Sequence, residues 1–395
     1  MNLSVISVGF VTGLAVVTAT AWLGAVLIAC RRRFGFAAAT ALVAAVLTVV
    51  TAADVVNAYY EYRPTIADVF GLARWTTLSS RQVALLTAPP SPSSSLAARE
   101  PNAAAAGRPR HAVLPVGQAT RRAVAARGAV TSVAVTDGQT SFPVGRVLVY
   151  LPPQYFTDPT ARFPTVYLLH GSPGEPADWL RSADAFHVGA ELAGAGHPLI
   201  LVFPPVGRSW SDDSECVDGA HEAVETYLIQ HVVPTIDARF RTIPSRNDRS
   251  IGGLSAGGFC ALNLGLRHRD LFSAVLDFSG YTHPTHQGGM AALFGHRPDL
   301  AAVVAANSPD RYAADLPALP PTRVFFACGA EEGGIAAAMR AMAATLGARG
   351  IPATMQRFPG GHTFAVWRPA LAAALAWLTG VEETSTAPAI ARPVV

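Results

Sequence analysis

Two long runs without charged side chains open the chain. Residues 2–30 contain none, and after three consecutive arginines at positions 31–33 a second uncharged run covers residues 34–53. A helix of about 20 apolar residues is long enough to cross the roughly 30 Å hydrocarbon layer of a bilayer. The pattern therefore predicts a transmembrane helical hairpin within residues 1–56, with membrane lipids as its partners along residues 2–53.

The arginine cluster between the two runs sets the expected orientation. Positively charged residues near the ends of spans favour the cytoplasmic side of a membrane. The turn is therefore expected in the cytoplasm, and the large C-terminal part is expected on the extracytoplasmic side of the cell membrane. A cleaved signal peptide is the alternative. It fits less well because no Lys or Arg precedes the first apolar run and the positive cluster follows it.

An aromatic segment follows the hairpin. Tyr59, Tyr60 and Tyr62 lie beyond the end of the second run, where they form either an interfacial aromatic belt or a packed aromatic cluster. Residues 57–86 are interpreted as a juxtamembrane segment, with a short amphipathic helix expected over residues 72–86.

A low-complexity segment comes next. Residues 87–128 are rich in Ala, Pro, Ser and Arg, and no apolar period runs through them. This composition is typical of a flexible linker. Residues 381–395 have a similar character, and a loose tail is expected there.

Residues 129–380 show a different pattern, in which short apolar runs alternate with helical stretches. Alternating strands and helices predict an α/β fold with a mostly parallel sheet that helices cover on both faces. In such sheets the active residues lie on loops at the carboxyl ends of strands. Strands are expected over residues 145–151, 165–169, 199–203, 249–254, 274–278, 323–328 and 353–358, and helices over residues 219–231, 256–267, 334–348 and 369–378.

The composition narrows the class of protein. Hydrophobic residues make up 50% of the 395 residues and charged residues 14%, which is too apolar for a disordered chain. The net charge is +3 and the basic residues are scattered, so no nucleic-acid-binding surface is indicated. The four cysteines form no C-x-x-C pair, so a zinc or thioredoxin-like motif is not expected.

A G-x-S-x-G segment at residues 253–257 supplies the candidate nucleophile, Ser255. The segment follows an expected strand and precedes an expected helix, which is the context of a nucleophile elbow. The sharp turn requires small flanking residues, and Gly253 and Gly257 meet that need. The serine oxygen then lies at a helix N-terminus, where developing negative charge is stabilised. The alternative is a glycine-rich tight turn without chemistry.

The loop at residues 170–174 directly follows the expected strand at residues 165–169. In α/β-hydrolases this position supplies half of the oxyanion hole. We expect the backbone N–H groups of Ser172 and Ala256 to stabilise the oxyanion, and loss of one such donor typically costs about 100-fold or more in rate. His170 lies on the same loop and is interpreted as structural rather than as a general base.

His362 is the candidate base. It follows a Gly-Gly pair and the expected strand at residues 353–358, and a final helix comes after it. The chain order of serine, acid and histidine is that of α/β-hydrolases. The candidate residues of a substrate pocket are His170, Trp179, His283 and His286.

Two adjacent glutamates compete for the role of the acid. Glu331 and Glu332 lie on the loop that ends the expected strand at residues 323–328. The acid must accept the Nδ1 proton and hold the imidazole in its working tautomer. Glu332 is favoured because its spacing from Gly329 fits the usual Gly-x-x-acid loop. Glu331 stays open, as does the alternative that both are solvated and the acid lies elsewhere.

Two cysteines lie near the candidate nucleophile. Cys216 belongs to the loop at residues 211–218, and Cys260 follows Ser255 on the next expected helix. In an extracytoplasmic domain these two can form a disulfide that braces the rim of the active site. Two free buried thiols are the alternative.

Several segments together resemble one family. They are residues 148–153 (LVYLPP), 167–172 (YLLHGS), 178–179 (DW), 251–258 (IGGLSAGG) and 361–363 (GHT). On these motifs, residues 145–380 resemble the esterase family that includes esterase D, feruloyl esterases and the antigen 85 mycolyltransferases. The resemblance implies the α/β-hydrolase fold, an acyl-enzyme mechanism and no cofactor.

The chain also departs from part of that family. Antigen 85 proteins carry Asp-Gly where this chain has His170-Gly171, and Arg where it has Pro173. These differences weigh against trehalose recognition and mycolyl transfer. The N-terminal hairpin is similar to that of membrane-bound actinobacterial esterases rather than to the secreted members.

The sequence thus predicts a membrane-anchored serine carboxylic-ester hydrolase with a Ser-Glu-His triad and no metal. Its expected substrates are lipid or cell-envelope esters. An acyltransferase of the mycolyltransferase type is an alternative, because water and an alcohol can both resolve an acyl-enzyme. A non-catalytic binding protein on a hydrolase fold is a second alternative.

Overall fold

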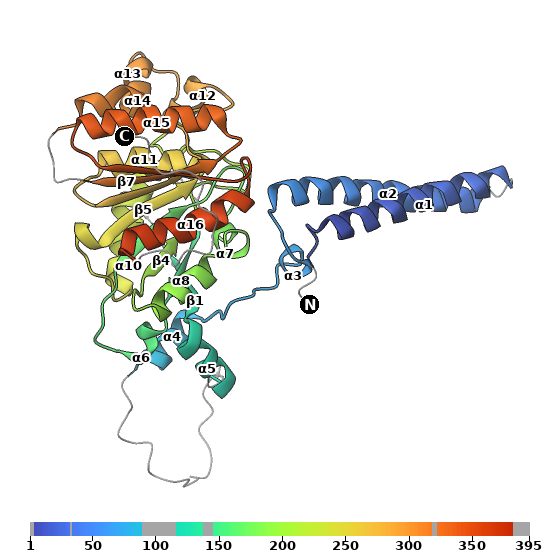
Figure 1. Cartoon of the computed structure of the whole chain (residues 1–395), viewed down its shortest axis with the longest axis horizontal. Helices are drawn as coiled ribbons and strands as arrows, with labels where there is room; N and C mark the ends of the chain where they lie inside the picture. The colour runs from blue at the N-terminus through green and yellow to red at the C-terminus, as the bar shows by residue number, and fades with distance from the viewer. Residues whose placement is uncertain (1–3, 32–33, 89–115, 137–144, 318–321, 382–395) are drawn as a thin grey trace, which may run out of the picture.

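In the residues that the structure describes, eight strands form one mostly parallel sheet (Figure 1). The computed structural model describes residues 4–31, 34–88, 116–136, 145–317 and 322–381. The order across the sheet is β1-β2-β4-β3-β5-β6-β7-β8; β2 is antiparallel to β1 and β4, and the other pairs are parallel. The strands are β1 (Ala129–Ala134), β2 (Arg146–Leu151), β3 (Thr165–Leu169), β4 (Ile200–Phe203), β5 (Arg249–Leu254), β6 (Ala274–Phe278), β7 (Arg323–Gly329) and β8 (Ala353–Phe358).

Helices cover both faces of this sheet (Figure 1). One face packs against α7 (Asp178–Arg181), α8 (Ala185–Gly194) and α16 (Phe364–Thr379). The other packs against η1 (Tyr227–Val232), α10 (Val233–Arg239), α11 (Ala256–Arg267) and α15 (Gly333–Ala348). The shorter helical segments are α3 (Ile66–Val69), α4 (Ser80–Thr87), α5 (Gln118–Arg127), α6 (Gln154–Thr157), α9 (Val224–Thr226), η2 (Arg246–Asp248), α12 (Met290–Phe294), α13 (Leu300–Ala306), α14 (Pro309–Tyr312) and η3 (Ala313–Asp315).

The central strands explain why the sequence pattern predicted the sheet. Every residue of β3, β5 and β6 is buried. A parallel strand that is covered on both faces carries mostly apolar or small side chains, so it forms a mostly apolar run in the sequence. The buried exceptions here include Arg249 and Ser250 in β5 and Asp277 in β6. The sequence bounds of these three strands agree with the structure. Their carboxyl ends lead into the loops that carry the candidate site.

The N-terminal segment forms the expected pair of helices, α1 (Val8–Cys30) and α2 (Phe34–Tyr60). Each is long and apolar enough to cross a membrane, and only 6% and 11% of their most apolar windows are buried in the structure. Small buried residues, Ala25, Ala37 and Ala44, lie where the two helices pack. The pair extends away from the sheet (Figure 1). The second helix continues to Tyr60, beyond the predicted end of the hairpin at residue 56.

The prediction of a flexible linker over residues 87–128 was wrong for residues 116–128, which the structure describes. Residues 89–115 lie outside the described residues, but α5 is a regular helix. Its Val124 is buried in the core, and the Tyr150 hydroxyl donates a hydrogen bond to the Arg127 carbonyl. One buried position in a short helix leaves no apolar period in the sequence, so the pattern gave no signal.

The juxtamembrane helix was predicted too long. The helix α4 begins at Ser80, and its N-terminus is closed by a capping box between Ser79 and Gln82. Leu78 and Val83 are buried in the main core. This segment therefore belongs to the globular domain. Val381 is described, and the rest of the expected tail lies outside the described residues.

Candidate active site

Ser255 occupies the sharp turn between β5 and α11. Its φ and ψ are 55° and −122°, a left-handed region that costs a non-glycine residue about 1–3 kcal/mol. The Ser255 N–H donates to the Phe278 carbonyl at 2.8 Å, which ties the turn to the next strand. The strain is thus held by the sheet, and the side chain lies at the N-terminus of a long helix.

The glycines around Ser255 are required by close backbone contacts. A Cβ on Gly253 would lie 1.9 Å from the Gly257 carbonyl oxygen, and a Cβ on Gly257 would lie 2.3 Å from the Leu169 carbonyl oxygen. Real Cβ atoms do not approach so closely without a shift of the backbone. The G-x-S-x-G pattern therefore has a steric cause in this fold.

The structure brings Ser255, His362 and Glu332 together. The Nε2 atom of His362 lies 2.8 Å from the Oγ atom of Ser255, and its Nδ1 atom lies 2.5 Å from the Oε1 atom of Glu332. Glu332 is buried, whereas Glu331 is exposed. The arrangement can move a proton from the serine hydroxyl to an imidazole that a carboxylate orients.

The second oxygen of Glu332 is also fixed. Its Oε2 atom accepts hydrogen bonds from the Gly329 N–H at 2.5 Å and from the Ser279 hydroxyl at 2.7 Å. Burial alone would raise the pKa of Glu332, but the hydrogen bonds from His362, Gly329 and Ser279 hold it below its ordinary value. The carboxylate is therefore ionised at neutral pH.

Two side chains that support the His362–Glu332 pair, Ser279 and Trp367, were not identified from the sequence. The Trp367 indole N–H donates to the Ser279 hydroxyl at 3.0 Å, and the Trp367 ring packs edge-on against the His362 ring. Both belong to segments next to recognised loops, because Ser279 follows β6 and Trp367 lies in the first turn of α16. Tyr281 lies on the same loop as Ser279; burial raises its pKa, and the Ser255 side chain opposes that rise.

The two expected oxyanion donors line one small hollow. Its volume is about 10 Å³, and its lining includes Ser172, Ala256 and the buried Glu215. The Ser172 hydroxyl donates to the Asp212 carbonyl at 3.1 Å, which links the loop at residues 170–174 to the loop after β4. Burial raises the pKa of Glu215 to about 7, and Asp213 adds to this effect. Sequence reasoning did not single out these carboxyl groups.

His170 lies in the wall of this hollow and is fixed by backbone groups. Its Nδ1 atom lies 2.8 Å from the Gly171 carbonyl, and its Nε2 atom accepts the Val206 N–H at 3.2 Å. Burial lowers the pKa of His170 to about 4, so the ring is neutral at physiological pH. Both nitrogens are thus occupied in shaping the loop.

The other candidate pocket residues are placed differently. The pocket prediction was wrong for Trp179, which has no exposed surface and packs against Phe278 in the core. Its position next to a loop in the sequence gave no indication that the side chain points inward. His283 is exposed and pairs with Asp310 at 2.9 Å, while His286 is half-buried and its Nδ1 atom accepts the Gly288 N–H.

Cys216 and Cys260 form a disulfide in the structure. Their Cα atoms are 5.4 Å apart. The bond joins the loop after β4 to the helix α11, which begins immediately after Ser255. It therefore ties together two segments that line the hollow beside the candidate nucleophile.

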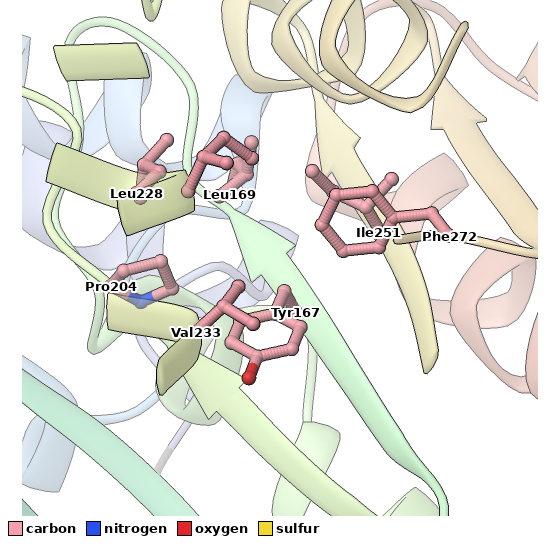
Figure 2. Close-up of a pocket in the computed structure, with 8 residues that line it drawn as sticks. Tyr167, Leu169, Pro204, Leu228, Val233, Ile251 and Phe272 are labelled. Carbon is pink, nitrogen blue, oxygen red and sulfur yellow. The ribbon is translucent and has the colours of Figure 1, made fainter. Parts of the chain in front are cut away.

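A second hollow is a packing gap in the core rather than a substrate site. Figure 2 shows side chains of β3, β5, η1 and α10 around it. Its volume is about 10 Å³ and its wall is almost entirely apolar. Neither Ser255 nor His362 lines it; the lining residues are Tyr167, Leu169, Pro204, Leu228, Ile229, Val233, Ile251 and Phe272.

Comparisons with known proteins identify the family of the catalytic domain. Residues 145–378 match the family model described as "Putative esterase". An uncharacterized protein of Corynebacterium glutamicum is 31% identical over 267 residues, which are 65% of this chain and 62% of that protein. An esterase of Mycobacterium tuberculosis is 28% identical over 243 residues, which are 55% of this chain and 52% of that protein. The match thus spans less than two thirds of either relative.

Solved structures share the fold. A ferulic acid esterase superposes with a TM-score of 0.52 at 23% identity, covering 64% of this chain and 99% of the other. FphF, a fluorophosphonate-binding serine hydrolase of Staphylococcus aureus, superposes with a TM-score of 0.53 at 20% identity, covering 64% of this chain and 98% of the other. At these identities the likeness establishes the α/β-hydrolase fold.

Proposed function

Because the chain belongs to the esterase family matched by residues 145–378, we propose that it is a serine carboxylic-ester hydrolase in which Ser255, His362 and Glu332 form the catalytic triad. The observation that carries the proposal is the continuous chain of hydrogen bonds from the Ser255 hydroxyl through both ring nitrogens of His362 to Glu332. Strained non-glycine residues cluster at functional sites, so a serine at positive φ in line with an oriented imidazole supports a catalytic role.

The reaction proceeds in two halves. His362 takes the Ser255 proton as the serine oxygen attacks the ester carbonyl, and the N–H groups of Ser172 and Ala256 stabilise the oxyanion. His362 then gives its proton to the leaving alcohol, and an acyl-enzyme on Ser255 remains. Water that is deprotonated by His362 attacks the acyl-enzyme, releases the acid and restores the serine.

The proposed substrates are lipid or cell-envelope esters at a membrane surface. Two helices of membrane-spanning length precede the catalytic domain and support this class. The arginine at position 31 follows the first helix, so the turn is proposed to be cytoplasmic and the domain extracytoplasmic. The Cys216–Cys260 disulfide suits such an oxidising compartment.

A fluorophosphonate probe tests the proposed nucleophile. Such probes phosphonylate a serine that an imidazole has activated, and they leave ordinary serines unmodified. We expect the full chain, solubilised in detergent, to be labelled at Ser255, and the label to be lost in the Ser255→Ala and His362→Ala variants. Labelling of Ser255→Ala at the wild-type level would show that another serine is the nucleophile.

The substrate class is tested separately with esters of graded acyl length. In detergent or in vesicles, we expect kcat/KM to rise with chain length as far as the substrate partitions into the lipid phase. A preference for acetyl esters over all longer chains would contradict the lipid assignment and leave the esterase assignment intact.

A further inference from the structure

The segment that follows the second membrane helix docks onto the catalytic domain through Tyr62. Its hydroxyl donates to the Asp178 Oδ2 atom at 2.5 Å and accepts the Trp210 indole N–H at 2.9 Å. The Ser182 hydroxyl donates to the Tyr62 carbonyl. The Tyr62 ring also packs edge-on against Phe364, with 5.6 Å between ring centroids. One side chain thus contacts three separate segments of the domain.

Charged neighbours reinforce this docking. Arg63 pairs with Glu175 at 3.1 Å and lies 3.8 Å from Asp178. On the other side of Tyr62, Glu61 pairs with Arg368 of α16 at 3.2 Å. The Glu61 φ of 52° marks the point where the chain leaves the direction of α2. The connection between the hairpin and the domain is therefore a fixed contact rather than a loose tether.

The segments that Tyr62 joins are those that surround Ser255. The Asp178 Oδ2 atom also accepts the Glu175 N–H at 2.7 Å, which closes the loop that begins with Ser172. The Gly174 N–H donates to the Trp210 carbonyl at 2.7 Å. Tyr62 therefore bridges the proposed oxyanion loop and the loop after β4.

The third segment that Tyr62 contacts carries the proposed base. Phe364 is two residues beyond His362 and packs on Trp367, which in turn packs on the His362 ring. The contact from the juxtamembrane segment thus reaches the loops that hold the oxyanion donor and the imidazole.

We propose that Tyr62 is a positioning residue, through which the membrane hairpin holds the oxyanion loop and the His362 loop in their working geometry. The inference rests on the proposed function, because it assigns Tyr62 a role in that same site. It makes the juxtamembrane segment part of the active form of the enzyme. Misplacement of reacting groups by about 1 Å can cost up to 100-fold in rate, so a small shift of these loops is expected to lower kcat.

Asp178 supplies a readout that a purely structural contact would not change. Its pKa is raised to about 6, chiefly by burial; hydrogen bonds from the Tyr62 hydroxyl and the Glu175 N–H, together with the Arg63 charge, oppose the rise, and the Glu175 carboxylate adds to it. The ionised carboxylate is the form that accepts hydrogen bonds from both Tyr62 and the Glu175 N–H. Removal of the Tyr62 hydroxyl therefore raises the pKa of Asp178, and the loop loses this support at a higher pH than in the wild type.

The test compares Tyr62→Phe with Tyr60→Phe in the full chain in detergent, with p-nitrophenyl butyrate as the probe substrate. Tyr60 packs on Tyr59 and is a matched control on the same segment. We expect Tyr62→Phe to lower kcat by about tenfold with KM changed less than twofold. We also expect the acid limb of its kcat–pH profile to move to higher pH. Tyr60→Phe should behave like the wild type in both respects.

A second variant covers the case in which Tyr62→Phe does not fold. Trp210→Phe removes the indole N–H that donates to Tyr62 from an exposed side chain, and we expect kcat to fall by about threefold. Wild-type kcat and an unmoved acid limb in Tyr62→Phe, or wild-type kcat in Trp210→Phe if the first variant is unfolded, would overturn the inference. A wild-type chain without Ser255-dependent hydrolysis would instead refute the proposed function.

Discussion

The Oε1 atom of Glu332 lies 2.5 Å from the Nδ1 atom of His362, while the adjacent Glu331 is exposed to solvent. Two neighbouring carboxylates with the same chemistry are thus distinguished by the turn after β7. The Gly329 N–H donates a hydrogen bond to the Oε2 atom of Glu332 and so fixes the orientation of the Glu332 carboxylate.

This contrast predicts opposite outcomes for two matched variants. In Glu332→Gln the amide can present an N–H to Nδ1, which favours the wrong imidazole tautomer, so kcat should fall by about a thousandfold or more. Glu331→Gln removes the same charge one residue away and should change kcat less than twofold. Steady-state kinetics on a p-nitrophenyl ester measure both, and a larger loss in Glu331→Gln would assign the acid to Glu331.

Ser279 is expected to tune the acid. Its hydroxyl donates to the Oε2 atom of Glu332 and accepts from the Trp367 indole. Ser279→Ala should lower kcat by about tenfold at pH 8, since a hydrogen bond to a charged group contributes about 1.5–3 kcal/mol. Because this bond helps to lower the pKa of Glu332, its loss raises that pKa, and activity should be lost at higher pH on acidification.

The half-buried Ser273 provides the control for that measurement. Its hydroxyl donates to the Asn247 carbonyl, away from the site. Ser273→Ala should keep the wild-type pH profile. If Ser279→Ala and Ser273→Ala gave the same profile, Ser279 would have no part in holding the acid.

The buried carboxyl group of Asp277 is expected to make the free energy of unfolding depend on pH, separately from catalysis. This side chain of β6 is buried, and burial raises its pKa from 3.8 to about 8, with the Gly280 N–H lowering it and the nearby Glu332 raising it. A raised folded-state pKa contributes stability that is present below about pH 4 and is lost as the pH rises through about 8. Asp277→Asn removes this ionisation, so its unfolding temperature relative to the wild type should increase between pH 5 and pH 8.

The exposed Asp299 gives the comparison, since its pKa is lowered by hydrogen bonding to Arg297. The unfolding temperature of Asp299→Asn relative to the wild type should stay constant over the same pH range, because Asp299 is ionised throughout it. Thermal unfolding of the full chain in detergent measures both variants. A constant difference for Asp277→Asn as well would show that Asp277 is ionised in the folded protein.

The sequence was informative where burial leaves a continuous pattern. The parallel strands β3, β5 and β6 are buried on both faces, so they form mostly apolar runs, and the predicted bounds agree with the structure. The order of the loops along the chain then placed Ser255, His362 and the glutamate pair at one edge of the sheet. Spacing alone favoured Glu332 over Glu331. The choice between them depends on local backbone geometry, which spacing does not show.

The features that were not predicted from the sequence have a common physical cause, since each depends on tertiary contacts. The strand β1 is a short edge strand, and its pairing with β2 rather than its composition defines it. Pro369 was taken as the start of the last helix, but α16 begins at Phe364 and the proline lies inside it. Tyr62 was interpreted as part of an aromatic group near the end of the second span. Its contact with Asp178 could not be predicted, because Asp178 is far away in the sequence.

Hydrolysis by the Ser255→Ala variant tests whether Ser255 is the nucleophile. The variant lacks the only atom that the account uses as nucleophile, and its methyl group fits the space of the hydroxyl, so the fold should be retained. With short p-nitrophenyl esters and the full chain in detergent, we predict that kcat falls by about a thousandfold or more while the unfolding temperature stays near that of the wild type. Hydrolysis at the wild-type rate by a folded Ser255→Ala protein would show that Ser255 is not the nucleophile.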